Sequence, residues 1–109
     1  MSTIHTGIVS TATYFPPHRR TREDFIRQGA DPALLTKWDV GEHRIAIGET
    51  GTDMEAKAGR EAIERAGLKP DDIDLVIGSC LGFEKANPPN APLTAYKIGA
   101  VNAAAIGVD

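Results

Sequence analysis

The sequence predicts an α/β fold in which helices cover a sheet that contains parallel strands. The strongest observation is the run Ile73–Gly78, which is nearly all apolar, as in a parallel strand buried on both faces. The second is a helical segment, residues 54–66, in which small alanines recur on one face and allow close packing on a sheet. The third is an alanine-rich helical segment from Asn90 to about Ala104, which leads into an apolar stretch at residues 105–109. This alternation of helix and strand is typical of α/β proteins.

The length and composition limit the class of protein. A chain of 109 residues is the length of one domain, and 41% hydrophobic with 25% charged residues is an ordinary globular composition. No apolar run approaches the roughly 20 residues of a membrane span. The N-terminus lacks the basic and apolar parts of a signal peptide. We therefore expect a cytoplasmic protein with no membrane partner.

The charged residues, the cysteine and the histidines argue against several kinds of site. The formal net charge of −3 gives no general attraction to phosphate backbones, so we expect no nucleic-acid partner. The single cysteine, Cys80, forms neither an internal disulfide nor a CxxC motif. His5, His18 and His43 share no metal-ligand spacing, so no metal centre is expected.

The N-terminal segment is predicted to be a strand followed by a turn. Residues 4–15 are rich in β-branched and aromatic side chains, and Pro16-Pro17 ends the strand because two backbone donors are lost. The basic cluster at residues 18–20 is expected in a solvated turn.

Two short helices and an extended arm are predicted next. Thr21 is expected to cap a helix that runs to about Gln28. Asp31, followed by a proline, is expected to cap a second helix that runs toward Trp38. Residues 40–47 alternate imperfectly between glycines, which indicates a short irregular strand or one arm of a hairpin.

A longer helix is predicted to begin at a capping box formed by Thr52 and Glu55. Glu61 and Arg65 form a favourable acid-before-base pair, and Gly67 is expected to end the helix. The face expected to point inward carries Met54, Ala58, Ala62 and Ala66, with Ile63 beside them.

The C-terminal part suggests a ligand loop and an incomplete sheet. After a turn at residues 70–72 and the strand Ile73–Gly78, residues 79–90 are dense in Gly, Pro and Asn. Open α/β sheets bind ligands at this end of their strands. The apolar stretch at residues 105–109 is expected to begin another core strand, and domains seldom end inside one. We therefore expect this chain to be the first part of something larger.

The order of these elements resembles a known family. It is carried by the segments Trp38–Ala46 and Glu61–Gly67 and by the strand Asp72–Ile77. Together they resemble the N-terminal segment of the β-ketoacyl-acyl carrier protein synthase III group of the thiolase superfamily, over essentially the whole chain. The resemblance implies that residues 1–109 form a partial N-terminal thiolase-like domain. The full αβαβα fold, a mixed sheet with covering helices, would need the remainder of the enzyme.

The resemblance implies an acyltransferase activity that this chain does not complete alone. The family carries out Claisen-type condensation or acyl transfer from thioesters of coenzyme A or acyl carrier protein, so coenzyme A enters as a thioester substrate and no cofactor is expected. The family's nucleophilic cysteine matches a position beyond Asp109, so no catalytic residue is expected here. The implied partners are the C-terminal part of the synthase as a second chain, a homodimer of the assembled enzyme, and an acyl carrier protein.

Three residues are implied to contact coenzyme A. Lys37 matches a basic position of the family that contacts the adenine, and Trp38 beside it is placed to stack on the same base. The alternative for Trp38 is packing in a core or an interface. Arg44 is either a phosphate or carrier-protein contact or an ion-pair partner of Glu42 or Glu49.

The loop that includes Phe83, Asn87 and Ala91 matches a family segment that crosses the dimer interface into the neighbour's acyl pocket. Alignment on Pro92 places the family's aromatic residue at Ala91, where a smaller side chain leaves a larger pocket unless Phe83 fills it. Cys80 is expected to be a packing or loop thiol, and the alternative of a nucleophile lacks a His or Asp partner at a recognisable spacing.

A second class of function stays open. The chain is alternatively a self-contained small α/β binding or regulatory module whose ligand loop is residues 79–90. Under the condensing-enzyme hypothesis, the isolated chain should expose the apolar faces of Ala58 with Ala62 and of Ala95 with Ile98, and should aggregate without its partner.

Overall fold

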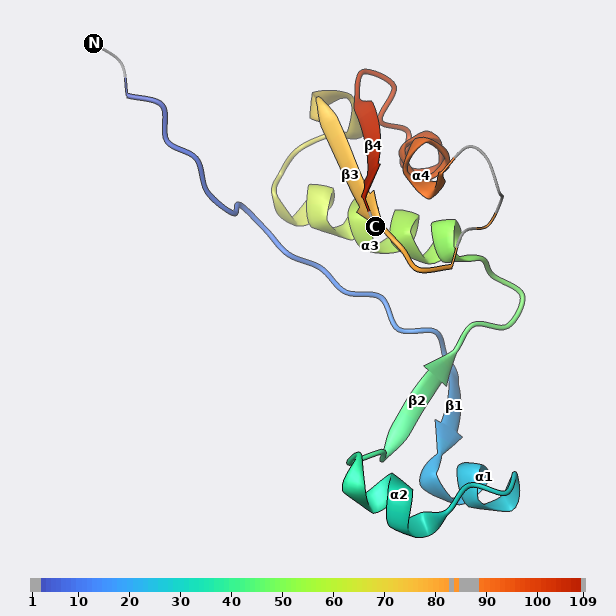
Figure 1. Ribbon diagram of the computed structural model, residues 1–109. Helices are drawn as coiled ribbons and strands as arrows, with labels where there is room; N and C mark the ends of the chain where they lie inside the picture. Colours follow the sequence, from blue (N-terminus) through green and yellow to red (C-terminus); the bar gives the residue numbers. More distant parts are fainter. Residues whose placement is uncertain (1–2, 83, 85–88, 109) are drawn as a thin grey trace. The chain divides into compact units, whose positions relative to one another are not determined.

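A computed structural model describes residues 3–82, 84 and 89–108, which form two compact units (Figure 1). The smaller unit spans residues 15–49, and the larger one holds the other described residues. The smaller unit contains β1 (His18–Thr21), α1 (Arg22–Arg27), α2 (Pro32–Lys37) and β2 (Glu42–Ile45). The larger unit contains α3 (Gly51–Arg65), a 3₁₀ turn (Pro70–Asp72), β3 (Leu75–Ser79), α4 (Asn90–Ile98) and β4 (Ala104–Val108).

The smaller unit is an antiparallel hairpin that carries two short helices between its strands. The predicted helix caps are confirmed: Thr21 forms a capping box with Asp24, and the Asp31 carboxylate accepts the backbone N–H of Ala33 at 2.9 Å. The extended arm predicted at residues 40–47 is confirmed as β2. The prediction of a solvated turn at residues 18–20 is wrong, because this segment pairs with β2 and so satisfies its backbone groups.

The larger unit is built on two parallel strands, β3 and β4, with Leu75 opposite Ala104 and Ser79 opposite Val108. The predicted parallel strand and the predicted C-terminal strand are therefore both confirmed. Helix α4 packs on β3, β4 and α3. A β-carbon at Gly78 would lie only 3.2 Å from Cβ of Ala91, so glycine is what allows α4 to approach the sheet.

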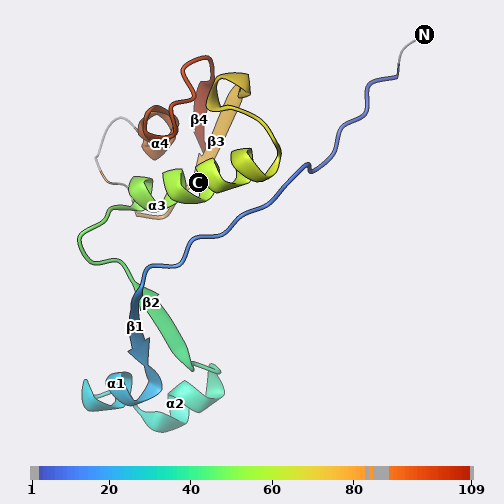
Figure 2. The ribbon, with the colours of Figure 1, turned by 180° about the vertical axis from the view of Figure 1, so that it is seen from behind.

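The opposite face of this sheet is uncovered. Side chains alternate between the two faces of a strand, so the face turned away from α4 carries Leu75 and Ile77 of β3 beside Ile106 and Val108 of β4. All four are exposed, and Ile77 is 62% exposed. The prediction of burial on both faces is thus wrong for the part of the chain that the structure describes, in which helices cover one face of the sheet (Figures 1 and 2).

The start of α3 differs from the prediction by two residues. The cap is Thr50, whose hydroxyl accepts the backbone N–H of Asp53 at 3.3 Å, while Asp53 accepts the N–H of Thr50 at 3.0 Å. Two pairs in the sequence have the spacing of a capping box, a threonine followed three residues later by an acidic residue: Thr50 with Asp53, and Thr52 with Glu55. Thr52 is fully buried and its hydroxyl is used in tertiary contacts, which leaves Thr50 as the cap.

The residues of α3 that are buried also differ from the inward face that the sequence predicts. Thr52 and Ala56 are its buried residues, and the close packing against α4 continues to Gly59. The predicted inward face, Met54, Ala58, Ala62 and Ala66, is only half-buried. The predicted pair of Arg65 with Glu61 is confirmed at 2.6 Å, and Gly67 takes the left-handed conformation with φ 71° just beyond the helix.

Helix α4 is shorter than predicted. It ends at Ile98 because Gly99 adopts φ 87°, a left-handed conformation that stops a helix. Val101, which the predicted helix included, lies in the turn beyond it and is exposed. Ala95 and Ile98 are buried, so the expectation that they form an exposed face is wrong.

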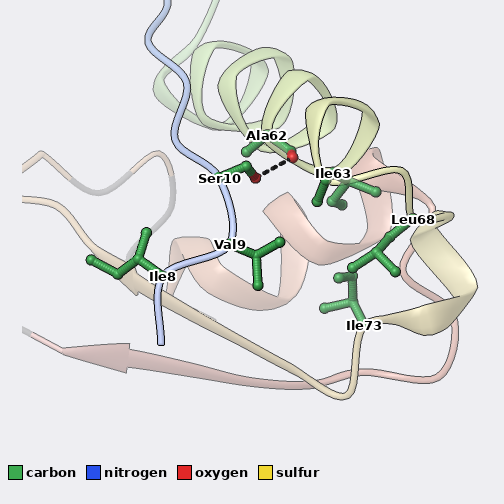
Figure 3. Close-up of a pocket in the computed structure, with 8 residues that line it drawn as sticks. Ile8, Val9, Ser10, Ala62, Ile63, Leu68 and Ile73 are labelled. Atoms are coloured by element: carbon green, nitrogen blue, oxygen red, sulfur yellow. Dashed lines mark hydrogen bonds between the residues drawn. The ribbon is translucent and has the colours of Figure 1, made fainter. Parts of the chain in front are cut away.

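Residues 3–14 are extended but form no strand. The predicted strand at residues 4–15 is wrong, because its backbone pairs with no strand of the described residues. Its contacts with α3 include the Ser10 hydroxyl, which donates to the carbonyl of Ala62 at 2.6 Å, and the Thr11 carbonyl, which accepts from Arg65 at 3.1 Å. The ammonium of Lys57 also lies 4.8 Å from the centroid of the Tyr14 ring. Ile8 and Val9 line an apolar pocket of about 260 Å³ at the C-terminal end of α3 (Figure 3). Both side chains remain largely exposed.

Candidate functional site

The first group of candidate residues lies at the end of α2. Lys37 is the last residue of this helix and Trp38 is its C-cap. The ammonium of Lys37 lies 5.8 Å from the centroid of the Trp38 ring, and the indole is 70% exposed. A flat aromatic face beside a positive charge is suited to an aromatic base that carries phosphate. Of the two expectations for Trp38, packing in the core of this unit is therefore excluded.

Asp39 fixes the direction in which the chain leaves this group. It adopts φ 51°, and its N–H donates to Thr36 while the N–H of Val40 donates to Leu35 at 2.8 Å. This pair of bonds is a Schellman motif, which normally has glycine at the left-handed position. The backbone that follows Trp38 is therefore tightly turned.

Arg44 lies on β2, directly opposite Arg19 on β1. Both arginines pair with Glu42, whose pKa is lowered from its ordinary value chiefly by the hydrogen bond from Arg19. Arg44 also donates to the carbonyl of Pro16 at 3.1 Å. The ion-pair alternative for Arg44 is thus the arrangement in this structure. Two guanidinium groups share one carboxylate, which leaves positive charge on this side of the hairpin.

The loop between β3 and α4 holds the second group. Phe83 and Asn87 lie outside the described residues. Ala91, 1% exposed, is in the first turn of α4 against Gly78. The Cys80 thiol donates to the carbonyl of Gly82 at 3.1 Å, consistent with a loop thiol.

Sequence reasoning missed a polar cluster centred on Lys97, near the end of α4. We call it the Lys97 cluster; its members are Thr50, Thr52, Asp53, Glu84 and Lys97. The ammonium of Lys97 lies 2.8 Å from Oδ1 of Asp53 and 2.7 Å from the hydroxyl of Thr52. The hydrogen bond from Lys97 is the first cause that lowers the pKa of Asp53 to about 2. No local pattern marks this cluster, because it joins α4 to α3 and to the loop.

A second missed feature is a cavity of about 310 Å³ between α3, α4 and β3. One wall holds the Glu55 carboxylate, which accepts the hydroxyl of Thr94 at 2.5 Å. The other lining residues are Ala58, Gly59, Val76, Ile77, Gly78, Ser79 and Ile98. The cavity therefore has a mainly apolar lining with one hydrogen-bonded carboxylate.

Within residues 3–82, 84 and 89–108, no three His, Cys, Asp or Glu side chains gather as a metal site requires. No helix in that part of the chain is long and apolar enough to cross a membrane.

Comparison with known proteins places the chain near one group of enzymes. It is 36% identical over 99 residues to the β-ketoacyl-[acyl-carrier-protein] synthase III of Clostridium acetobutylicum, covering 89% of this chain and 30% of that protein. It is 34% identical over 109 residues to the synthase of the same name from Listeria innocua, covering 97% and 35%. The chain thus spans about a third of the length of these relatives. No protein-family model matches it.

Solved structures agree with the sequence comparison. The 3-oxoacyl-[acyl-carrier-protein] synthase III of Aquifex aeolicus superposes with a TM-score of 0.85 and 31% identity, over 93% of this chain and 33% of that one. The priming β-ketosynthase of the R1128 polyketide pathway superposes with a TM-score of 0.84 and 27% identity, over 93% of this chain and 31% of that one. OleA of Xanthomonas campestris, 19% identical with a TM-score of 0.79, shares the fold. The chain therefore has part of a thiolase-like α/β fold, the part found in the N-terminal segment of these condensing enzymes.

Proposed function

We propose that this chain, similar in sequence and fold to the N-terminal segment of β-ketoacyl-acyl carrier protein synthase III, is one part of a condensing enzyme of that kind. The observation that carries the proposal is the superposition of nearly the whole chain on the Aquifex synthase at above 30% identity. The part contributes two strands of a sheet, the helices that cover one face, and the entrance for an acyl thioester. The nucleophilic cysteine belongs to the rest of the enzyme.

The uncovered sheet face supports this proposal. A sheet of two parallel strands is rarely stable alone, and parallel sheets in α/β proteins are covered on both faces. Leu75, Ile77, Ile106 and Val108 offer four apolar side chains on one face. Covering that face with the rest of the synthase, as a second chain or a continuation of this one, would remove this apolar surface from water. The same exposed face argues against a self-contained binding module.

The proposed reaction begins with an acyl thioester of coenzyme A. The acyl group moves to the cysteine sulfur of the other part, the thioester bond to coenzyme A breaks, and coenzyme A leaves as the thiol. A malonyl group held as a thioester on acyl carrier protein then loses carbon dioxide, and the electron pair of the broken carbon–carbon bond leaves a carbon nucleophile. This nucleophile attacks the acyl-enzyme, forms the new carbon–carbon bond and frees the cysteine as its thiolate. Simple transfer of the acyl group to another acceptor is the shorter form of the same chemistry.

In this proposal Lys37, Trp38 and Arg44 contact the nucleotide end of coenzyme A. The exposed Trp38 ring stacks on the adenine beside Lys37, and Arg44 attracts phosphate or the carrier protein. Ala91 and its loop lie near the acyl group or the dimer interface. The assembled enzyme acts as a homodimer.

The proposal is tested on the protein purified from its native source without denaturation. The intact mass of the assembly is measured first, and the mass of each component is then measured after denaturation. We expect a stoichiometric companion about twice as long as this chain, or this chain as part of one longer polypeptide, since it spans about a third of its relatives. The assembly should form a β-ketoacyl product from acyl-coenzyme A and malonyl-acyl carrier protein. A folded lone species of 11.6 kDa without this activity would overturn the proposal.

A further inference from the structure

We propose that Lys97 is a positioning residue, which holds Glu84, in the loop between β3 and α4, against the N-terminus of α3. The fixation is a property of this chain. Its consequence for the acyl group rests on the proposed function, which puts this loop near the acyl site.

The first step of the argument is that α3 fixes the ammonium of Lys97. Oδ1 of Asp53 lies 2.8 Å from Nζ, and Oδ2 of the same carboxylate accepts the N–H of Thr50 in the helix cap. The hydroxyl of Thr52, which is fully buried, lies 2.7 Å from Nζ. The charge of Lys97 is therefore held by side chains that the first turn of α3 already orients.

The second step is that Glu84 is held at both its side chain and its backbone. One carboxylate oxygen lies 3.9 Å from Nζ of Lys97, and the other accepts the hydroxyl of Thr52. The backbone N–H of Glu84 donates to Oδ1 of Asn90 at 3.0 Å, and the amide of Asn90 donates to the carbonyl of Gly82 at 3.4 Å. Asn90, the first residue of α4, is 5% exposed. Residues 82 and 84 are thereby fastened to both helices.

The third step concerns the charge. The ammonium of Lys97 contacts both carboxylates, at 2.8 Å from Oδ1 of Asp53 and 3.9 Å from one oxygen of Glu84. Without Lys97 the two carboxylates lose the positive charge that they share, and the charge of Glu84 is then more stable when it is hydrated. Asp53 is retained by its bonds in the helix cap, so Glu84 is the residue released.

The test is hydrogen–deuterium exchange of the protein as purified, with any accompanying chain. Lys97→Met removes the charge and keeps much of the side-chain volume, and Lys69→Met, at an exposed lysine outside the cluster, is the matched control. We expect amides of the peptide covering residues 80–93 to exchange about tenfold faster in Lys97→Met only. The peptide covering residues 73–79 should keep its exchange rate. Equal acceleration of both peptides, or of neither, would overturn the proposal.

Two further variants separate positioning from general stability. Lys97→Arg retains the charge and should restore slow exchange of residues 80–93. Glu84→Gln should accelerate exchange by itself but add nothing when combined with Lys97→Met, since both changes break one contact. If circular dichroism shows that Lys97→Met does not fold, the exchange rate of residues 80–93 in Glu84→Gln becomes the test. An unchanged rate in that variant would overturn the proposal.

Activity measurements test whether Lys97 also affects the position of the acyl group. In the assembled enzyme, Lys97→Met should change the ratio of kcat/KM values for a short and a long acyl-coenzyme A, and Lys69→Met should not. Faster exchange with an unchanged ratio would overturn the role of Lys97 in positioning the acyl site. A wild-type assembly with no condensing activity would overturn the proposed function, while the exchange result would still decide whether Lys97 holds Glu84.

Discussion

Gly59 of α3 faces Ile98 of α4 so closely that a β-carbon at residue 59 would lie 2.8 Å from Cδ1 of Ile98. Gly59 thus leaves room for the end of the Ile98 side chain between the two helices. The contact joins the centre of α3 to the buried cluster of Ala56, Ile98 and Ala100.

This contact predicts different effects of the same substitution within one helix. Gly51→Ala meets only ordinary contacts, so its better helix propensity should leave stability unchanged or raised by up to about 1 kcal/mol. Gly59→Ala gains the same propensity but forces Cδ1, the far end of the buried Ile98 side chain, to move, which should offset that gain by about 1 kcal/mol. Urea unfolding should give a lower free energy of unfolding for Gly59→Ala than for Gly51→Ala. Adding Ile98→Val, which removes Cδ1, to both variants should reduce this difference in free energy. A Gly59→Ala variant as stable as Gly51→Ala would contradict the packing.

The lowered pKa of Asp53 predicts a loss of stability in acid. Its pKa is about 2 in the folded chain against an ordinary 3.8, so a proton binds the unfolded chain more tightly. The contribution is fully present above about pH 4 and is lost as the pH falls toward 2. In Asp53→Asn, the urea midpoint should fall less between pH 5 and pH 2 than in wild type. Glu64→Gln, at an exposed carboxylate of α3, serves as the control and should follow the wild-type profile.

The left-handed conformation of Asp39 predicts that glycine is preferred there. Asp39→Gly should stabilise the folded chain by about 1 kcal/mol, because a side chain at positive φ is strained. Gly29 has φ 98° after α1, with bonds from Gly29 to Ile26 and from Ala30 to Phe25 that match the motif after α2. Gly29→Asp should therefore destabilise by a similar amount. Calorimetric unfolding of the two variants should show shifts of opposite sign.

Trp38 is the only tryptophan and allows a direct test of nucleotide binding. In the assembled enzyme, coenzyme A should quench the fluorescence of the exposed indole as the adenine stacks on it. Lys37→Met should weaken binding about tenfold through loss of the cationic contact to the adenine, whereas Lys69→Met should bind normally. If equal concentrations of coenzyme A quench wild type, Lys37→Met and Lys69→Met to the same extent, Lys37 does not contact the ligand.

The uncovered face of β3 and β4 predicts where the rest of the enzyme packs. Ile77→Lys places a charge on that face and should abolish assembly while making the separate chain less prone to aggregate. Val101→Lys changes an equally apolar, exposed residue in the turn after α4 and should leave assembly intact. Size-exclusion chromatography with light scattering distinguishes the two variants. Normal assembly of Ile77→Lys would show that this face is not the contact.

The candidate site was predictable only where its residues are neighbours in the sequence. Lys37 and Trp38 are adjacent, so their proximity required no knowledge of the fold. Lys97 and Thr52 are 45 residues apart, and no periodicity relates them. The Lys97 cluster exists because α4 packs against the start of α3, a contact that sequence patterns do not encode.

The sequence by itself determined the local elements of this protein: the caps at Thr21 and Asp31, the glycine stop after α3 and the apolar strand β3. Each depends on side chains and backbone within a few residues, so local chemistry is sufficient. The tertiary structure decided which threonine caps α3 and which stripe of that helix is buried. It also decided that residues 3–14 stay extended without a partner strand. These outcomes depend on contacts between distant segments, where burial and partner availability outweigh local preference.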